Sequence, residues 1–384
     1  MRDLSYTAKM KITNTYGLGK GSILLPSAKV EIEKWPVVAC DQYTQDRAYW
    51  TKVSEITDKT PSTAHIILPE VYLSDSNKSE RIQNIQNTMK EYLNNDIFMK
   101  DIHDMIYLER TTAYGRTRKG LITTIDLEEY EWKPFSKAKI RATEATIIDR
   151  IPPRMEIRRG AALESPHIML LVNDSNKFLV EKTGELTKAA QNSTPVYNTD
   201  LMQNSGHITG WVVDSADAKA NVEKALEAIS TKNTRADGSL FMFAVGDGNH
   251  SLATAKAVWE EFKEKASPEE IENHPARYAL VEIVNIFDEG LTFEPIHRVL
   301  FNVNSDKLIS YVAQQLGGNI AKVEDPIELE EKVKNSTAGF GFVCDKGMFF
   351  LSTPVTELAV KPVAKLTIFM EVRKFSVLVE KMAE

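Results

Sequence analysis

Short apolar runs alternate along this chain with turns and with stretches in which apolar residues recur at helical spacing. The clearest case lies near the middle, where residues 240–245 form an apolar run typical of a buried strand. The turn Gly246-Asp-Gly-Asn249 follows, because Gly and Asn tolerate positive φ. From Ser251 onward apolar residues recur every three or four positions. The pattern therefore predicts a strand, a tight turn and a helix in direct succession.

The same reasoning predicts elements along the rest of the chain. Strands are predicted at 35–43, 66–72, 105–112, 121–127, 168–172, 178–180, near 196, 208–213, and 276–287 with a hairpin partner at 291–301. Helices are predicted after a cap at Thr44 or Asp46, from Ser79, through Leu186, and over 217–229, 306–316, 327–334 and 366–382. A hairpin of 340–344 with 348–352 completes a small region at the end of the chain.

These elements predict an α/β fold of mixed α+β character. We expect a core over residues 1–302 and a smaller α+β region over 303–384 that packs on it. The chain has 384 residues, of which 42% are hydrophobic and 26% charged, an ordinary globular composition.

The charge and cysteine content narrow the class of protein. A formal net charge of -7 disfavours a nucleic-acid surface as the main feature. Two cysteines, Cys40 and Cys344, do not make a disulfide framework or a Cys-x-x-Cys pair. No apolar run reaches 18 residues and the first residues lack a signal pattern, so no membrane span is expected. We expect a cytoplasmic protein, and a homo-oligomer is possible.

The turn after residue 245 is the first candidate site. A helix that begins directly after a strand exposes backbone N–H groups, which attract an anion. Gly246 and Gly248 lack a Cβ, so a phosphate could approach the backbone, with Asp247 and His250 beside it as acid, base or metal-binding groups. The spacing matches neither a dinucleotide fingerprint nor a Walker loop. The alternative is that Asp247 and Asn249 only cap the helix and the glycines only make the turn.

Two further segments carry groups suited to an anionic ligand. The predicted hairpin loop at 114–120 holds Arg116, Arg118 and Lys119, and arginine can clamp a phosphate or carboxylate with two hydrogen bonds. Asp41 and Tyr43 follow a predicted strand, at the end where α/β proteins place ligand contacts. The alternative for both segments is an ordinary solvated loop.

The connection at 131–160 and the run after residue 290 add weaker candidates. The connection contains Pro134 and two further prolines and shows little periodicity, and long loops in compact proteins are often functional. It carries Glu144. In the later run, Pro295 indicates an edge or a bulge, and His297 and Arg298 could face a ligand. A lone histidine beside an apolar strand is more often structural.

Several of these stretches resemble one family, the domain of unknown function 1015 family. The resemblance runs from about residue 25 to 301, and its most specific segments are 274–278, 285–291 and 295–300, with 38–43 and 114–121 in addition. Residues 246–251 stand where the family carries Asp-Gly-His-His-Arg, a motif similar to the phosphate-contacting loop of the ParB/sulfiredoxin superfamily. The resemblance implies a ParB-like core interrupted by a long β-rich insertion at about 100–215.

The sequence departs from that motif at positions that matter. Asn249 replaces the first His and Ser251 replaces the Arg, which removes a natural phosphate clamp. The loop has no Cys, so sulfiredoxin-type reduction is rejected. In the connection, the family's His-Glu-x-Thr appears as residues 143–146, in which Glu144 and Thr146 are kept.

The resemblance and the residues together suggest a nucleotide-dependent small-molecule kinase. The backbone of 246–251 would hold phosphate, Asp247 would bind Mg²⁺ with ATP or ADP, and Glu144 or His250 would act as base. Neutralising cations would come from Arg116, Arg118 and Lys256. We expect the site where 246–251, 115–120 and 141–150 converge. The alternative is a regulatory protein that binds an anion or nucleotide without turnover, and nucleic-acid binding is disfavoured.

Overall fold

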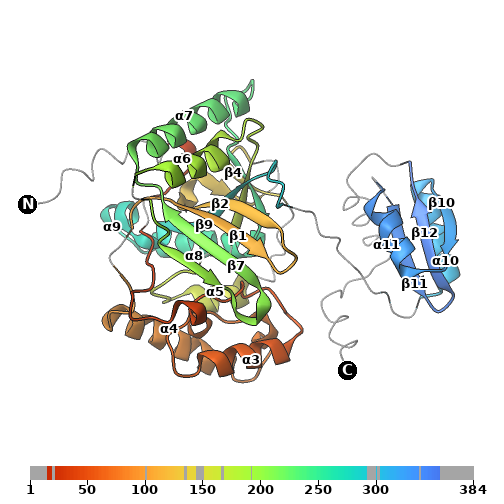
Figure 1. Ribbon diagram of the computed structural model, residues 1–384, viewed down its shortest axis with the longest axis horizontal. Helices are drawn as coiled ribbons and strands as arrows, with labels where there is room; N and C mark the ends of the chain where they lie inside the picture. Colours follow the sequence, from red (N-terminus) through yellow and green to blue (C-terminus); the bar gives the residue numbers. More distant parts are fainter. Residues whose placement is uncertain are drawn as a thin grey trace, which may run out of the picture. The chain divides into compact units, whose positions relative to one another are not determined.

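A large mixed sheet organises the first part of the chain (Figure 1). The computed structural model describes residues 15–19, 22–99, 102–133, 136–143, 151–165, 168–191, 193–291, 300, 303–336 and 339–354. The chain divides into two compact units, Met1–Phe293 and Glu294–Glu384. The predicted division at residue 302 lies close by, and the packing of the second region on the core stays a prediction.

In the first unit, the described strands form one nine-stranded sheet in the order β3-β4-β8-β5-β9-β2-β1-β7-β6. The sheet is mixed. For example, β5 pairs with β9 in parallel, whereas β1 pairs with β2 antiparallel. The strands are β1 Ile106–Thr112, β2 Thr117–Asp126, β3 Tyr130–Glu131, β4 Ile140–Ala142, β5 Ile168–Val172, β6 Tyr197–Asp200, β7 Gly206–Val212, β8 Phe243–Asp247 and β9 Tyr278–Asn285. The predicted mixed α/β class is therefore confirmed.

Helices pack around this sheet (Figure 1). They are α3 Arg47–Thr57, α4 Lys78–Asn94, α5 Ile151–Arg158, α6 Thr183–Ala189, α7 Ala216–Asn233, α8 Asn249–Lys263 and α9 Pro268–Asn273. The predicted cap of α3 is confirmed, since the Asp46 carboxylate accepts a hydrogen bond from the Tyr49 N–H at 2.9 Å. Short 3-10 turns join several elements: Ile32–Lys34, Thr63–His65, Glu70–Tyr72, Leu127–Glu129, Met202–Asn204 and Pro275–Arg277.

The alternation of side chains along β1 and β2 separates two cores. Tyr107 and Leu121 belong to the main core, which the apolar sides of α7 and α8 complete. Their neighbours Ile106, Leu108 and Ile122 point to the opposite face and pack in a separate cluster. That face therefore has its own environment, and residues at even positions of these strands share it.

Two predicted strands are wrong. Residues 35–43 contain no strand, because isolated hydrogen bonds rather than a ladder satisfy the backbone there. The Trp35 carbonyl accepts from the hydroxyls of Ser62 and Thr63 and from the Thr63 N–H. Residues 66–72 end in the 3-10 turn Glu70–Tyr72 instead of an edge strand. Apolar runs of this length do not distinguish a strand from a packed loop, and at 35–43 hydrogen bonds to residues distant in sequence decided the outcome.

Two further corrections concern residues 131–182. The predicted strand at 178–180 is a π-helical turn, Phe178–Lys182, because the Asp174 carboxylate accepts the N–H groups of Phe178 and Leu179, each at 2.7 Å. The connection at 131–160 contains helix α5, which the sequence analysis did not predict. The predicted hairpin partner at 291–301 and the helix at 366–382 lie largely outside the described residues.

The second unit has a three-stranded sheet of order β10-β12-β11, with helices α10 and α11. Its bounds are α10 Ser305–Leu316, β10 Asn319–Val323, α11 Pro326–Lys334, β11 Gly339–Cys344 and β12 Gly347–Ser352. The predicted helices at 306–316 and 327–334 and the predicted hairpin are confirmed, whereas β10 was missed. Its burial pattern, exposed at four of five positions, explains why no apolar signal marks it.

Candidate functional site

The strand, turn and helix predicted around residue 246 are present as β8 and α8. Gly248 adopts φ +81° between them, a conformation that favours glycine. A Cβ on Gly246 would lie 2.6 Å from Leu171 Cγ, and one on Gly248 would lie 3.0 Å from Ile168 Cγ1. Both glycines are thus required by the turn and by packing against β5, without reference to a ligand.

Asn249 joins this turn to the connection before it. Its side chain is buried, and its Oδ1 accepts a hydrogen bond from the Thr143 N–H at 3.3 Å. The Thr143 hydroxyl in turn donates to the Val245 carbonyl at 2.6 Å. The structure therefore brings the 246–251 turn and the first part of the 141–150 connection together, as expected. The Asn that departs from the family motif has a structural role at this junction.

The other candidates near α8 are placed as follows. Asp247 is exposed, and its carboxylate accepts from the Gly248 N–H at 2.7 Å. His250 and Ser251 lie half-buried in the first turn of α8. Lys256 lies farther along the helix, where its ammonium donates to the Leu127 carbonyl and pairs with Glu260, each at 2.9 Å. Glu144, His297 and Arg298 lie outside the described residues.

The strand order keeps the 246–251 turn apart from the cationic hairpin. β5 and β9 stand between β8 and β2, which places β8 about 14 Å from β2 at the usual strand spacing. Arg118 also belongs to β2 rather than to the loop, whereas Arg116 is exposed in the turn before it. The turn and the hairpin therefore do not meet along the sheet.

Arg118 is instead part of a charged group on the face that carries Ile106 and Leu108. Its guanidinium donates to Glu282 of β9 with two hydrogen bonds, of 3.1 and 2.9 Å. The Glu282 side chain reaches Arg118 by lying over Gly120, where a Cβ would collide with its carboxylate. This pair is largely buried, with 17% and 15% of the two side chains exposed.

Arg110 of β1 stands directly opposite Arg118 in the strand register. Its Nε is buried and has no hydrogen-bond partner among the described residues. Burial lowers the pKa of Arg110, and the neighbouring Arg118 lowers it further, against the opposite effect of Glu282. Two guanidinium groups thus share one carboxylate, which leaves a net positive charge on this face of the sheet.

Two tyrosines complete this group, which we call the arginine cluster: Arg110, Arg118, Glu282, Tyr43 and Tyr49. The two tyrosines both act electrostatically on Arg110, and their rings stack with centroids 3.8 Å apart. The Tyr49 hydroxyl lies 3.5 Å from the Ser205 hydroxyl. Thr112 of β1 pairs with Gly206, the residue after Ser205. Like the Arg110 Nε, the Thr112 Oγ1 is buried without a hydrogen-bond partner among the described residues. Tyr43 and Arg118, both predicted site residues, therefore both act electrostatically on Arg110.

The backbone around the arginine cluster adopts uncommon conformations. Tyr43 has φ 50°, and Gln203 and Asn204, just before Ser205, have φ 58° and 55°. Left-handed backbone is costly for residues other than glycine and concentrates at functional sites. These conformations mark the same part of the molecule as the buried charge does.

The loop that carries Tyr43 is fixed at its other end. The Cys40 carbonyl accepts from the Glu70 N–H at 2.8 Å, and Glu70 forms an ion pair with Arg154 of α5. Burial, together with the adjacent Asp41 carboxylate, raises the pKa of Cys40 to about 12, so this thiol stays protonated at neutral pH. Asp41, a predicted ligand contact, thus lies beside an ordered ion pair.

Arg110 was not predicted from the sequence, although one signal could have identified it. Residues 106, 108 and 110 alternate along β1, so an arginine at 110 shares the face of two apolar residues. A charged residue at an inward position of an amphipathic strand is uncommon without a partner. Glu282 and Ser205 gave no such signal. Glu282 reaches Arg118 only through the pairing of β9 with β2, and Ser205 reaches Tyr49 only through the tertiary fold.

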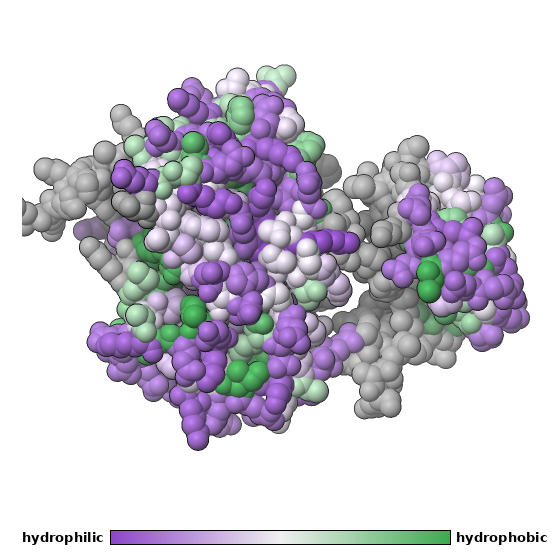
Figure 2. Space-filling view, viewed as in Figure 1, coloured by the Kyte–Doolittle hydropathy of each residue, from purple (hydrophilic) through white to green (hydrophobic). Residues whose placement is uncertain are grey.

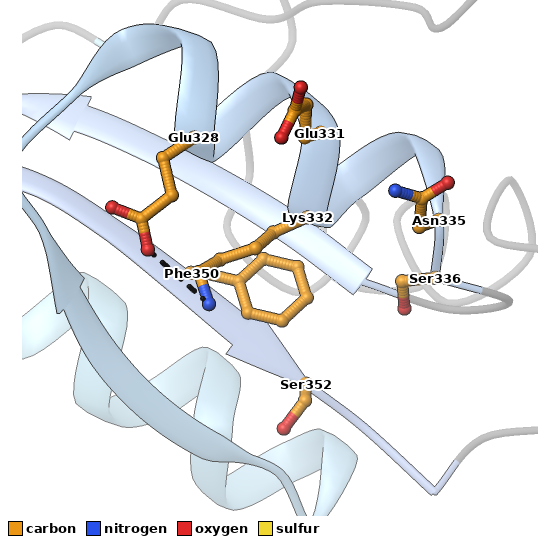
Figure 3. Close-up of a pocket in the computed structure, with 7 residues that line it drawn as sticks. All are labelled: Glu328, Glu331, Lys332, Asn335, Ser336, Phe350 and Ser352. Atoms are coloured by element: carbon orange, nitrogen blue, oxygen red, sulfur yellow. Dashed lines mark ion pairs between the residues drawn. The ribbon is translucent and has the colours of Figure 1, made fainter.

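The second unit has a hollow of its own, of about 490 Å³ (Figure 3). It lies between α11 and β12, and Phe350 points into it. Lys332 at its rim pairs with Glu328 at 3.5 Å. The remaining lining residues are Glu331, Asn335, Ser336 and Ser352. Its charges are of both signs and exposed, which gives no preference for a ligand class.

Surface and metal chemistry give little further direction. Hydrophilic residues cover most of the face shown in Figure 2, with apolar residues in small patches. In the described part of the chain, no three His, Cys, Asp or Glu side chains are placed to hold a metal ion. No described helix is long and apolar enough to cross a bilayer.

The fold is that of a mixed α/β protein, with a cluster of cationic and polar side chains on one face of a large sheet. The family model described as "Protein of unknown function (DUF1015)" matches residues 23–369, and the chain belongs to this family. The match extends beyond the predicted resemblance, which ended near residue 301. No curated protein and no solved structure matches the chain. The likeness to the ParB/sulfiredoxin superfamily therefore stays a prediction.

Proposed function

We propose that the first unit binds a small organic anion at the arginine cluster. The buried Nε of Arg110, which has no partner among the described residues, is the observation that carries this proposal. A buried guanidinium costs several kcal/mol unless a charge compensates it. Glu282 is already engaged with Arg118, so a bound anion would supply the missing negative charge.

The neighbouring donors favour a ligand with more than one acceptor oxygen. The Thr112 Oγ1 shares a strand face with Arg110 and, like its Nε, lacks a partner in the described part of the structure. A carboxylate or phosphate can accept from a guanidinium and a hydroxyl at once. The same chemistry agrees with a regulatory protein that binds an anion without turnover, because guanidinium and hydroxyl donors are sufficient for recognition.

The proposal is tested by measuring thermal stabilisation of the full chain by acetate and inorganic phosphate, with sodium chloride at equal ionic strength as reference. The wild-type midpoint should rise with either anion, and Arg110→Met should abolish the rise. Arg159→Met is the matched control, since Arg159 pairs with Glu261 on the exposed surface. An equal response from the two variants, or no response in the wild type at millimolar anion, would contradict the proposal.

Phosphotransfer with ATP or ADP and Mg²⁺ is a second candidate, and the exposed Asp247 carboxylate at the start of α8 favours it. In this mechanism the carboxylate would hold Mg²⁺ and the first N–H groups of α8 would contact phosphate. Calorimetry with Mg·ATP and Mg·ADP should then give binding heat that Asp247→Ala removes. Absence of heat at millimolar nucleotide would exclude this mechanism.

A further inference from the structure

We infer that the anion bound at the arginine cluster carries a planar aromatic ring, which stacks on Tyr43. This inference rests on the proposed anion site and adds the chemical class of the ligand. Acids of this class are aromatic carboxylates and phosphate esters of aromatic or heteroaromatic groups. Both present a negative charge and a flat face within one small molecule.

Tyr43 offers one free aromatic face beside the buried charge. Its ring stacks on Tyr49 with an interplanar angle of 11°, and 43% of the residue is exposed. Tyr49 is only 8% exposed, so it forms the inner layer of the stack and Tyr43 forms the outer one. A planar ligand ring can add a third layer on the outer face, and such stacking contributes about 1–3 kcal/mol per ring.

The stack is held in place before any ligand arrives. Trp50 packs edge-on against Tyr49 at 5.3 Å, and its indole N–H donates to the Tyr43 carbonyl at 3.3 Å. The Asp46 N–H donates to the same carbonyl at 3.1 Å. A preorganised aromatic surface loses little entropy when a ligand stacks on it, which favours binding.

The backbone of Tyr43 supports a role for its side chain. A tyrosine at φ 50° is less stable than glycine or asparagine would be, because those residues adopt this conformation more readily. The turn alone would be more stable with one of those residues. The aromatic ring at this position is therefore explained by what it contacts.

The experiment compares matched ligands that differ only in the ring: phenyl phosphate with methyl phosphate, and benzoate with acetate. Affinities are measured by calorimetry for the wild type, Tyr43→Phe, Tyr43→Leu and Arg110→Met. In at least one pair the ring should improve wild-type affinity about 5- to 150-fold, the range that stacking of one ring gives. Tyr43→Phe should keep that gain, and Tyr43→Leu should lower the affinity of phenyl phosphate and benzoate by a larger factor than that of methyl phosphate and acetate.

The outcomes separate the two proposals. Equal affinity of both members of each pair, or equal losses for all ligands in Tyr43→Leu, overturns the stacking inference and leaves the anion site in place. Binding of ring-bearing ligands that survives Arg110→Met overturns the anion site. If no ligand of either pair binds the wild type, both proposals are wrong.

Discussion

Arg110 combines three unfavourable conditions: a buried Nε, a second guanidinium opposite it in the sheet, and a single carboxylate shared between the two. In a purely structural role this arrangement would be replaced easily, because an apolar residue of similar size fits a half-buried strand position. Its presence is consistent with a site whose stability is lowered in favour of binding.

This leads to a prediction about stability without ligand. Arg110→Met should raise the free energy of unfolding of the ligand-free protein by about 1 kcal/mol, because it removes an uncompensated charge and keeps the side-chain volume. Chemical denaturation in a buffer free of carboxylate and phosphate measures the change. A loss of stability would instead show that Arg110 has a structural partner.

Asn249 should behave in the opposite way. Asn249→Ala removes an acceptor for the Thr143 N–H from a buried position, so we expect a loss of about 1–3 kcal/mol. Urea denaturation measures this loss. Asn87→Ala serves as the control, because Asn87 is exposed on helix α4 and its replacement should not lower stability. A cost for Asn249→Ala no larger than that of the control would contradict the role of the junction.

Glu181 gives a prediction about pH. Burial raises its pKa, and the nearby Asp288 and Asp174 act in the same direction, although Asn285 donates to its carboxylate. A carboxyl group whose pKa is raised in the folded state binds more protons there than when unfolded. Its contribution to stability therefore falls as pH rises above about 4.5, the unfolded value.

Glu181→Gln should remove this decline. The variant should gain stability relative to the wild type between about pH 5 and pH 7.5, as measured by urea denaturation at both values. Glu270→Gln is the control, because hydrogen bonds from Ser267 lower the pKa of Glu270, so its difference in stability from the wild type should stay constant between these two pH values. A difference between Glu181→Gln and the wild type that does not change with pH would show that Glu181 does not titrate as proposed.

For single residues, the sequence predicted some members of the candidate site from their chemistry, but it did not predict which residues lie next to one another. Arg118 and Tyr43 were predicted as ligand contacts from their chemistry and local position, and the structure places both in the arginine cluster. Arg110 and Glu282 were not predicted, because their importance depends on the register of β1, β2 and β9. Pairing between strands distant in sequence leaves no local pattern.

At the scale of elements, the strand, turn and helix from β8 to α8 were predictable because glycine, asparagine and apolar spacing act locally. The strand predicted at 35–43 was wrong because its apolar residues pack without a ladder. The turn at Phe178–Lys182 was mispredicted because a carboxylate four residues earlier bonds its first N–H groups. Local propensity predicts an element well where backbone groups hydrogen-bond to one another. It fails where side chains supply the hydrogen-bond partners of the backbone.

Substitutions of Gly246 and Gly248 test whether packing alone requires glycine in the turn between β8 and α8. Gly248→Ala should cost more than Gly238→Ala, since both have positive φ but only the Cβ at 248 would meet another residue, Ile168. We expect about 1 kcal/mol for Gly238→Ala, from backbone strain alone. Gly246→Ala should cost about 1–3 kcal/mol because its Cβ would meet Leu171. Thermal denaturation measures all three, and equal costs at 248 and 238 would contradict the packing argument.

At the scale of the whole molecule, the chain has two units, each with its own sheet and buried residues. The α/β class and the presence of a smaller α+β region near the end were predictable from the order of elements. The order of nine strands in one sheet was not, because short mixed strands fit many arrangements. The match to the family covers residues of both units.

This organisation predicts that damage to the second unit is separable from binding. Leu351 is fully buried in the central strand of the smaller sheet, so Leu351→Ala should cost about 2–5 kcal/mol there. Hydrogen exchange should show the loss of protection in the second unit, whereas the thermal response to phosphate should stay that of the wild type. Loss of that response would mean that the site depends on the second unit.

The contact between Glu282 and Gly120 has a consequence for recognition. The acid covers Arg118 only because position 120 bears a hydrogen atom where other amino acids bear carbon. Any larger residue at position 120 would displace the Glu282 carboxylate. Arg110 and Arg118 would then both be available to a bound ligand. A ligand with two negative charges would then be preferred over a ligand with one. The absence of a Cβ at position 120 therefore determines which ligand charge the arginine cluster prefers.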